Sequence, residues 1–238
     1  MRLTAPGPEE MRGAIVIMAK APREGFVKTR LRGVSPPCDV VRLSECMLRD
    51  TLALVQGLPR VHAAVMCPPA DAAAIAARLP ADVQVIGQDG QGLGAALVSV
   101  FERFVRSFRR VVAVDADSPH LPASILESAL SQLDTNDVVV GPTEDGGYYL
   151  VGASAMHPRL FDPAPLGTRD ACDALCTSAR ALGLSVGLTG VWYDVDVPAD
   201  LRRLAADLRI DPSRAPRTAA FLASWERLAE AQADQRTG

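Results

Sequence analysis

A short apolar run that ends in two aspartates constrains this sequence more than any other feature. Residues 111–114 read Val-Val-Ala-Val, which indicates a buried central strand, and Asp115 and Asp117 follow directly. Pro119 then disfavours helix at the residue before it. Ligands of open α/β sheets bind at the carboxyl ends of the strands, where carboxylates suit a Mg²⁺ or Mn²⁺ ion that also holds substrate phosphates. The two aspartates could otherwise cap the next helix or face solvent.

Length, charge and cysteine content limit the class of protein. The chain has 238 residues, 48% of them hydrophobic, which predicts one large α/β domain, or one domain with a tail. The net charge of −3 argues against a nucleic-acid partner. Five unevenly spaced cysteines predict a reduced protein, with Cys172 and Cys176 as small buried residues on one helix face. Because the sequence has neither a signal-peptide pattern nor a membrane-length apolar run, we expect a cytoplasmic protein with no membrane partner.

Strand and helix patterns alternate along the chain, which predicts a mostly parallel sheet with helices on both faces. Strands are expected at 14–19, 61–66, 83–86, 111–114, 137–141 and 185–188, and helices at 38–55, 71–79, 93–108, 122–133, 170–182, 198–208 and 218–233. We expect a flexible leader at 1–12, a nucleotide-binding domain at 13–210, and a C-terminal helix and tail at 211–238. Asp71 is expected to cap its helix. The last helix is expected to pack on the domain or on a second copy in a homodimer.

The segment after the first strand, residues 20–31, has the composition of a phosphate-binding loop. It contains four cationic side chains together with Pro22 and Gly25. Backbone N–H groups and the amino end of the next helix favour anions here, and Lys20, Lys28 and Arg30 would add positive charge. The Walker sequence is absent. A basic loop that only faces solvent would have the same composition.

Two later segments also suit ligand binding. Residues 87–94 are rich in glycine and lie between a predicted strand and a predicted helix, so their backbone can approach a ligand closely. Asp145-Gly-Gly predicts a tight turn or hairpin before an aromatic strand, and could be no more than a turn. The proline-rich segment 153–169 is long enough to be a substrate lid.

A second pair of aspartates, Asp194 and Asp196, comes shortly before Pro198. Proline favours the first position of a helix, so this pair lies near a predicted helix start. The pair could cap that helix, or it could join the first pair of aspartates around a metal ion. The residues alone leave both readings open.

Taken together, these motifs resemble the nucleotide-diphospho-sugar transferase superfamily, which has a GT-A-like, Rossmann-like fold. The similarity is strongest to a branch of small transferases that are labelled either as a domain of unknown function or as glycosyltransferases. Four ordered motifs carry it: Ala-Lys-x-Pro-x-x-Gly-x-Val-Lys-Thr-Arg-Leu at 19–31, Asp-x-Pro at 117–119, Gly-Pro-x-x-Asp-Gly-Gly-Tyr-Tyr-Leu at 141–150, and Asp-Val-Asp-x-Pro-x-Asp-Leu at 194–201. With the flanking strands and helices, the match extends over residues 14–208.

The chain also resembles the guanylyltransferases of deazaflavin-cofactor biosynthesis, which charge a small phosphorylated acid with GTP. The shared pieces are Val-Lys-Thr-Arg-Leu, Met-Leu-x-Asp-Thr-Leu at 47–52, the Asp-x-Pro turn, His-Pro-Arg at 157–159, and the last acidic motif. Those enzymes have a Gly-Thr-rich segment where this chain has Asp-Gly-Gly-Tyr-Tyr at 145–149. That segment faces the acceptor, so the acceptor of this chain stays open.

These resemblances imply two reactions. The first, which we favour, is nucleotidyl transfer, in which an acceptor phosphate or phosphonate attacks the α-phosphorus of an NTP and pyrophosphate leaves. The second is glycosyl transfer from a sugar nucleotide, with Asp115 and Asp117 gripping a diphosphate through a metal and Asp145 or an aspartate of the last motif as base. A non-catalytic nucleotide sensor is a third reading, ranked below both.

The resemblance also implies roles for particular residues, with Mg²⁺ or Mn²⁺ as cofactor and a nucleotide plus a small-molecule acceptor as partners. The catalytic set is Lys20, Lys28, Arg30 and Asp117. The nucleotide-binding set is Ala19, Gly25, Gln88, Gly92 and Gly94. The acceptor set is Asp145, Gly146, Gly147 and Tyr148. The metal set is Asp115, Asp117, Asp194 and Asp196.

Overall fold

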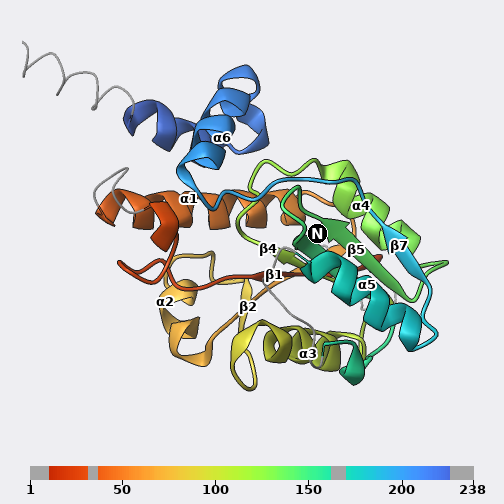
Figure 1. The fold of residues 1–238 in the computed structure, drawn as a ribbon. Helices are drawn as coiled ribbons and strands as arrows, with labels where there is room; N and C mark the ends of the chain where they lie inside the picture. Colours follow the sequence, from red (N-terminus) through yellow and green to blue (C-terminus); the bar gives the residue numbers. More distant parts are fainter. Residues whose placement is uncertain (1–10, 32–36, 162–169, 226–238) are drawn as a thin grey trace, which may run out of the picture.

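The computed structural model describes residues 11–31, 37–161 and 170–225. Its centre is a seven-stranded sheet in the order β3-β2-β1-β4-β6-β5-β7 (Figure 1). The strands are β1 (Gly13–Met18), β2 (Val61–Cys67), β3 (Gln84–Gly87), β4 (Val111–Asp115), β5 (Val138–Pro142), β6 (Tyr148–Ala153) and β7 (Val186–Leu188). Only β6 runs antiparallel to its neighbours, β4 and β5. The predicted mostly parallel sheet is confirmed.

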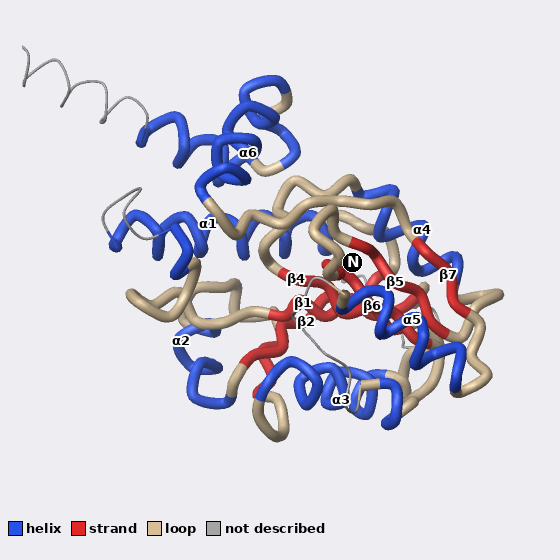
Figure 2. Tube along the Cα trace, viewed as in Figure 1, coloured by secondary structure: helices blue, strands red, loops and turns tan. Residues whose placement is uncertain are grey.

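Helices cover both faces of this sheet, as the alternating sequence pattern predicts (Figure 2). They are α1 (Pro37–Gln56), α2 (Ala72–Ala76), α3 (Gly92–Phe104), α4 (Ala123–Gln132), α5 (Ala171–Ala181) and α6 (Pro198–Ile210). Residues 216–225 are also helical. None of the helices in the described ranges has the length and apolar character needed to cross a bilayer. The end of the helix predicted at 218–233, the predicted tail and most of the predicted leader lie outside the described residues, as does part of the predicted lid, 162–169.

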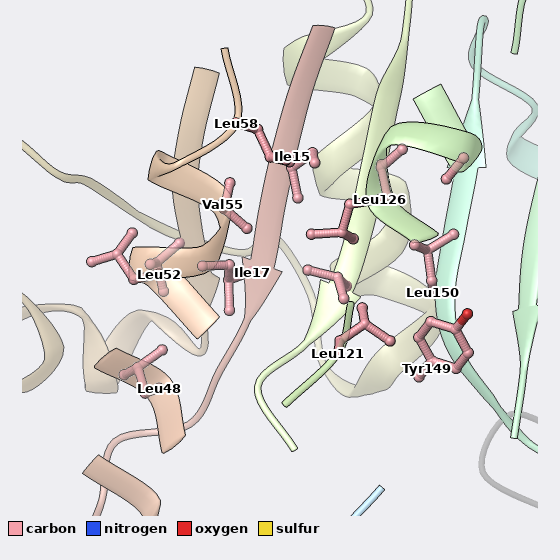
Figure 3. Packing of buried hydrophobic residues seen from close by; sticks show 14 of the residues in the cluster. Ile15, Ile17, Leu48, Leu52, Val55, Leu58, Leu121, Leu126, Tyr149 and Leu150 are labelled. Atoms are coloured by element: carbon pink, nitrogen blue, oxygen red, sulfur yellow. The ribbon is translucent and has the colours of Figure 1, made fainter. Parts of the chain in front are cut away.

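The strands are buried on both faces, which explains their continuous apolar runs. Ile15 and Ile17 of β1 belong to the cluster that packs under α1 and α4 (Figure 3). Ala14 and Val16, which alternate with these two isoleucines along the strand, belong to the cluster on the opposite face, under α3 and α5. Successive side chains of a strand point to opposite faces, so one short segment supplies both cores.

Two predicted helices are shorter than the sequence pattern indicates. The α-helical part of the segment predicted at 71–79 is Ala72–Ala76, and a proline follows at 80. Proline disfavours helix at the residue before it, which limits how far this helix extends. The helix predicted at 93–108 ends at Phe104, where residues 105–107 form a turn.

A third apolar cluster joins α6 and the helical residues 216–225 to α1 (Figure 1). One buried carboxylate fixes this contact. Asp50 of α1 accepts hydrogen bonds from the backbone N–H and the hydroxyl of Thr218, both at 2.8 Å, and from the backbone N–H of Arg217 at 3.2 Å. It therefore satisfies free N–H groups at the start of the last described helix, as an N-cap residue would.

We predict that Asp50→Ala lowers the free energy of unfolding by about 2 kcal/mol, because it leaves buried donors of the last described helix without an acceptor. Urea unfolding measures this change. Asp82→Ala is the matched control, since Asp82 is exposed, and it should change stability by less than about 0.5 kcal/mol. Equal effects of the two variants would contradict the capping role.

The turn after β4 is packed against the segment before α6 through a buried histidine. His120 is fully buried, and its ring lies 4.5 Å from that of Tyr193 and 5.2 Å from that of Trp192. Neither ring nitrogen has a hydrogen-bond partner within the described part of the chain. Burial lowers the pKa of His120 to about 4, with Asp207 opposing and Arg214 and Arg203 adding to the effect.

We predict that this histidine makes the fold sensitive to acid. In the unfolded chain His120 binds a proton below about pH 6.5, whereas in the native state it binds this proton only below about pH 4. Stability is therefore lost as pH falls through this window, by up to about 3 kcal/mol. Denaturant midpoints at several pH values for wild type and His120→Leu isolate this loss. Parallel pH profiles of the two proteins, or an NMR titration of His120 near pH 6.5, would contradict it.

Candidate active site

The carboxyl ends of β1 and β4 border a pocket of about 490 Å³. The two strands are parallel neighbours with Met18 opposite Asp115, so the segments that follow them leave the sheet at the same level. The loop after β1, the turn after β4, the start of α3 and one side of α1 form the walls. Among the residues predicted from the sequence, Ala19, Lys20, Lys28, Arg30, Gln88, Gly92, Asp115, Asp117 and Asp196 line the pocket. Gly25, Gly94, Asp194 and the predicted acceptor residues lie outside its described lining.

Lys28 joins the two acidic motifs at this pocket. Its Nζ lies 2.7 Å from Asp117 Oδ1 and 3.2 Å from Asp196 Oδ1, and only 5% of its side chain is exposed. Its backbone has a φ of 45°, a left-handed conformation that residues other than glycine rarely adopt. Burial lowers the pKa of Lys28, but Asp117 and Asp196 outweigh burial and raise the pKa above its ordinary value. Lys28 is therefore a charged, buried cation held by carboxylates from two distant parts of the chain.

Two more cations of the same loop stand at the open side of the pocket. Arg30 Nη1 lies 3.3 Å from Asp196 Oδ2, with 69% of its side chain exposed. Lys20 is exposed as well. Lys20 and Lys28 are the only lysines in the sequence, and both line this pocket.

The carboxylates of the two acidic motifs lie close together, which is one of the two arrangements that the sequence leaves open. Val195 donates its backbone N–H to Asp117 O at 3.1 Å, which joins the two motifs. Burial raises the pKa of Asp115 well above its usual range, and the charges of Asp117 and Asp194 add to this. Burial and the charge of Asp196 raise the pKa of Asp194 to about 6. The site holds more negative charge than Lys28 neutralises.

The chemistry of these side chains fits a hard divalent cation. Carboxylate oxygens are the preferred ligands of Mg²⁺ and Mn²⁺. Burial, together with the neighbouring carboxylates, raises the pKa of Asp115 and Asp194, and a bound cation would favour their charged forms. The side chains do not converge on one point: no group of three His, Cys, Asp or Glu residues in the described ranges is arranged to hold a metal ion. The ammonium of Lys28 lies between Asp117 and Asp196. Asp115, Asp117, Asp194 and Asp196 are the residues that would hold the ion.

The prediction that Asp71 caps its helix through its side chain is wrong. Asp71 is buried, and its Oδ2 accepts the backbone N–H of Ala21 at 2.9 Å, while Oδ1 pairs with the guanidinium of Arg23. No side-chain cap bond is formed to the helix. The β1 loop provides a cation and a free N–H group, and a carboxylate binds these more strongly than a single helix N–H. Asp71 thus anchors the loop that carries Lys28.

The glycine-rich segment borders the pocket, and the side-chain amide of its glutamine is bonded to the backbone of the same segment. Gln88 Nε2 donates to the carbonyl oxygens of Gly90 and Gly92, both at 3.3 Å. Gly92 begins α3 with a φ of 84°, which glycine adopts without strain. Gln88 therefore shapes this segment, and backbone groups beside it face the pocket.

The Asp-Gly-Gly turn lies at the same edge of the sheet. Val114 of β4 pairs with Leu150 of β6, which places the residues just before Leu150 beside the aspartates that end β4. The turn is closed by its own carboxylate: Asp145 Oδ1 accepts the hydroxyl of Thr143 at 2.5 Å and the N–H of Gly147 at 3.2 Å. The charge of Asp145 contributes to the raised pKa of Asp194, so the turn adjoins the acidic cluster.

Asp196 is near the start of α6 but does not cap it. Asp200 Oδ2 accepts the backbone N–H groups of Asp196 and Val197, at 3.0 and 2.8 Å, and so holds the helix start in place. This leaves the carboxylate of Asp196 for Lys28 and Arg30. Of the two readings of the last acidic pair, the structure favours a site residue at position 196.

Phe26, Ser44 and Pro68 are among the pocket residues that were not anticipated from the sequence. Phe26 projects from the β1 loop with 66% exposure, under the guanidinium of Arg23. Ser44 comes from α1 and Pro68 from the residue after β2. An apolar aromatic inside a cationic loop is a signal that could have identified Phe26. Ser44 and Pro68 carry no sequence signal, because only the packing of α1 and β2 places them there.

Solved structures share this fold. A protein from Desulfovibrio desulfuricans G20, provisionally named a nucleotide-diphospho-sugar transferase, is 28% identical, with a TM-score of 0.84 over 93% of this chain and 98% of that one. A CMP:2-keto-3-deoxy-manno-octonic acid synthetase complexed with CTP is 15% identical, with a TM-score of 0.56 over 84% and 99%. Rv0371C from Mycobacterium tuberculosis H37Rv, in complex with manganese, is 19% identical, with a TM-score of 0.52 over 80% and 96%. The last two show the fold alone.

No curated protein matches the chain in a sequence search. A family model does match: residues 51–168 fit the family described as uncharacterized protein conserved in bacteria (DUF2064). These residues include the end of α1, the glycine-rich segment, the first acidic motif and the Asp-Gly-Gly turn. The resemblance inferred from the motifs is confirmed: residues 51–168 match the model of the DUF2064 family, and the chain has the fold of the nucleotide-diphospho-sugar transferases.

Proposed function

We propose that this chain is a metal-dependent nucleotidylyltransferase that joins the NMP part of an NTP to a small phosphorylated or phosphonate acceptor and releases pyrophosphate. One observation carries the proposal: a buried lysine on the loop after β1 pairs with carboxylates of both acidic motifs inside a pocket at the carboxyl edge of the sheet. Ligands of open α/β sheets bind at this edge. The pocket therefore brings phosphate-binding cations and metal-binding carboxylates together.

Three cations of the β1 loop suit a triphosphate. Lys20 and Arg30 are exposed at the open side, and Lys28 is buried behind them. A triphosphate carries more negative charge than a diphosphate, so three cationic side chains match it better. A bound metal ion would neutralise charge on the phosphates, held by Asp117 together with Asp115, Asp194 or Asp196. Rv0371C, which has the same fold, is solved in complex with manganese, and this supports the proposed metal dependence.

The reaction needs positioning more than a protein nucleophile. An oxygen of the acceptor phosphate bonds to the α-phosphorus, the bond from that phosphorus to its bridging oxygen breaks, and pyrophosphate leaves with the electron pair. A phosphate oxygen is already ionised, so no general base is required. Backbone groups near Gln88 and Gly92 would face base and ribose, with guanine proposed as the base from the resemblance to guanylyltransferases. Gly146, Gly147 and Tyr148 would bound the acceptor.

Glycosyl transfer from a sugar nucleotide is the second candidate. The observation in its favour is the similarity to the Desulfovibrio protein, whose provisional name is a nucleotide-diphospho-sugar transferase. In that reaction the same cations and metal would hold a diphosphate, and Asp145 or Asp194 would take the proton of an acceptor hydroxyl. The two reactions differ in the nucleotide that the pocket prefers.

We predict that one NTP binds in the presence of Mg²⁺ at least about tenfold more tightly than UDP- or GDP-sugars, because the triphosphate engages all three cations, a difference of about 1.4 kcal/mol. Calorimetric titration of the full chain with each of the four NTPs and with both sugar nucleotides measures this preference. A preference for a sugar nucleotide would contradict nucleotidyl transfer as the function and favour glycosyl transfer.

We predict that Asp117→Ala abolishes turnover, since the carboxylate that would hold the metal is lost. Lys28→Ala should lower kcat/KM for the nucleotide by at least about tenfold, about 1.4 kcal/mol of transition-state binding. Release of pyrophosphate from the preferred NTP, with phosphorylated acids as acceptors, measures both.

Asp134→Ala is the matched control for Asp117→Ala. Asp134 is an exposed aspartate that pairs with Arg110 and lies beyond the amino end of β5. Its loss should leave kcat/KM unchanged within about twofold, because surface ion pairs contribute little. Full activity of Asp117→Ala would contradict the assignment of Asp117 as a metal ligand. An unchanged kcat/KM in Lys28→Ala would mean that the β1 loop is only a solvated basic loop.

A further inference from the structure

An exposed aromatic ring lines the active-site pocket, although neither the phosphates nor the metal ion of the proposed reaction would need one. Phe26 of the β1 loop is 66% exposed and lines the pocket together with Leu93 of α3, which is 41% exposed. Six large apolar side chains are exposed in the described ranges, of which Phe26 is the one aromatic, and these two line the pocket. Single exposed apolar residues are common, but two at one pocket indicate a surface that a ligand covers.

The β1 loop holds this ring in a defined place. Residues 23–26 form a turn in which Phe26 N–H donates to Arg23 O at 3.1 Å, and Gly25 has a φ of 79°, which glycine adopts without strain. The guanidinium of Arg23 lies over the ring, 4.9 Å from its centre, and a cation in this position is attracted to the aromatic face. Arg23 also pairs with the buried carboxylate of Asp71. Two side-chain contacts therefore connect Phe26 to the segment after β2.

These contacts place the ring on the side of the pocket that lies away from the first acidic motif. Asp71 follows β2, and in the sheet β2 lies on one side of β1 while β4, which carries that motif, lies on the other. The described lining from β2, the glycine-rich segment and α3 has no acidic side chain and consists of Met66, Pro68, Gln88, Gly92, Leu93 and Ala96. The pocket is thus largely apolar toward β2 and charged toward β4, where Lys28 meets Asp117.

We propose that Phe26 stacks on the base of the bound nucleotide, with Leu93 as a second apolar contact, and so determines where the base lies. This rests on the proposed function, because it takes the pocket to be a nucleotide site. A nucleobase is flat and has a π face, which makes stacking on an aromatic side chain favourable for any base. A nucleotide carries its base at one end and its phosphates at the other, which matches the apolar and charged sides of the pocket. The predicted acceptor residues lie outside the described lining, so the acceptor does not account for Phe26.

The test compares a nucleotide with a ligand that has the same phosphate chain but no base. Calorimetric titration of the full chain in Mg²⁺ measures the affinities for the preferred NTP and for inorganic tripolyphosphate, in wild type and in Phe26→Ala. If the chain prefers a sugar nucleotide, that ligand and inorganic pyrophosphate take their places. We expect Phe26→Ala to weaken nucleotide binding at least about fivefold, as the loss of one base–aromatic stack does. Binding of the phosphate chain alone should stay within about twofold, since it does not involve the ring.

Two further variants complete the experiment. Phe26→Tyr keeps the flat ring and should bind the nucleotide within about twofold of wild type. Ile210→Ala is the matched control, because Ile210 is an exposed apolar residue at the end of α6, outside the described lining of the pocket. It should change neither affinity by more than about twofold, as expected for a surface substitution.

The outcomes separate the stacking role from the proposed function. Equal weakening of both ligands by Phe26→Ala would mean that the substitution only disturbs the β1 loop around Lys28, and would overturn the stacking role. Unchanged nucleotide binding in Phe26→Ala would also overturn it, while the nucleotide site itself would stand. A wild-type chain that binds no nucleotide would instead contradict the proposed function, and the stacking role with it.

Discussion

The ion pair of Lys28 with Asp117 and Asp196 is the interaction on which the site depends. It joins the loop after β1, the turn after β4 and the segment before α6, which are far apart in the sequence. Removing the ammonium of Lys28 from water costs free energy, and an ion pair that includes a buried charge often stabilises a fold no more than well-packed apolar side chains would in the same place. Such a cluster is therefore poor evidence for stability. Its position at the ligand-binding edge of the sheet indicates that the charges serve a ligand.

The packing around this cluster explains how it is held in place. Asp71 anchors the β1 loop through Ala21 and Arg23, and Asp200 anchors the segment that carries Asp196. The pairing of β1 with β4 places the loop after β1 and the turn after β4 at one level. Lys28, Asp117 and Asp196 thus lie on segments that hydrogen bonds and strand pairing hold in place. The side chains of Lys20 and Arg30 are exposed and can adjust to a ligand.

The sequence could predict the parts of the fold that depend on local pattern. Runs such as 111–114 are apolar on both faces because each strand is covered by helices on both sides, and a parallel sheet follows from that. The lining role of Lys28, Asp117 and Asp196 was predictable because loops that follow parallel strands meet at one edge. The Asp71 contact was not, since a carboxylate before a helix looks like a cap whichever partner it finds. The inward turn of Gln88 and the position of Phe26 also depend on tertiary packing, which spacing along the chain does not encode.

The central claim, that nucleotide phosphates bind where Lys28 meets the two acidic motifs, can be tested through the amines of the chain. Lys20 and Lys28 are its only lysines and both line the pocket, so apart from the α-amino group every amine reports on this site. The measurement is the rate of acetylation of each lysine, followed by mass spectrometry, with and without the preferred nucleotide and Mg²⁺. The account predicts that the nucleotide slows acetylation of the exposed Lys20 severalfold and leaves the α-amino group unaffected. Unchanged rates at both lysines, at a nucleotide concentration that saturates binding, would contradict it.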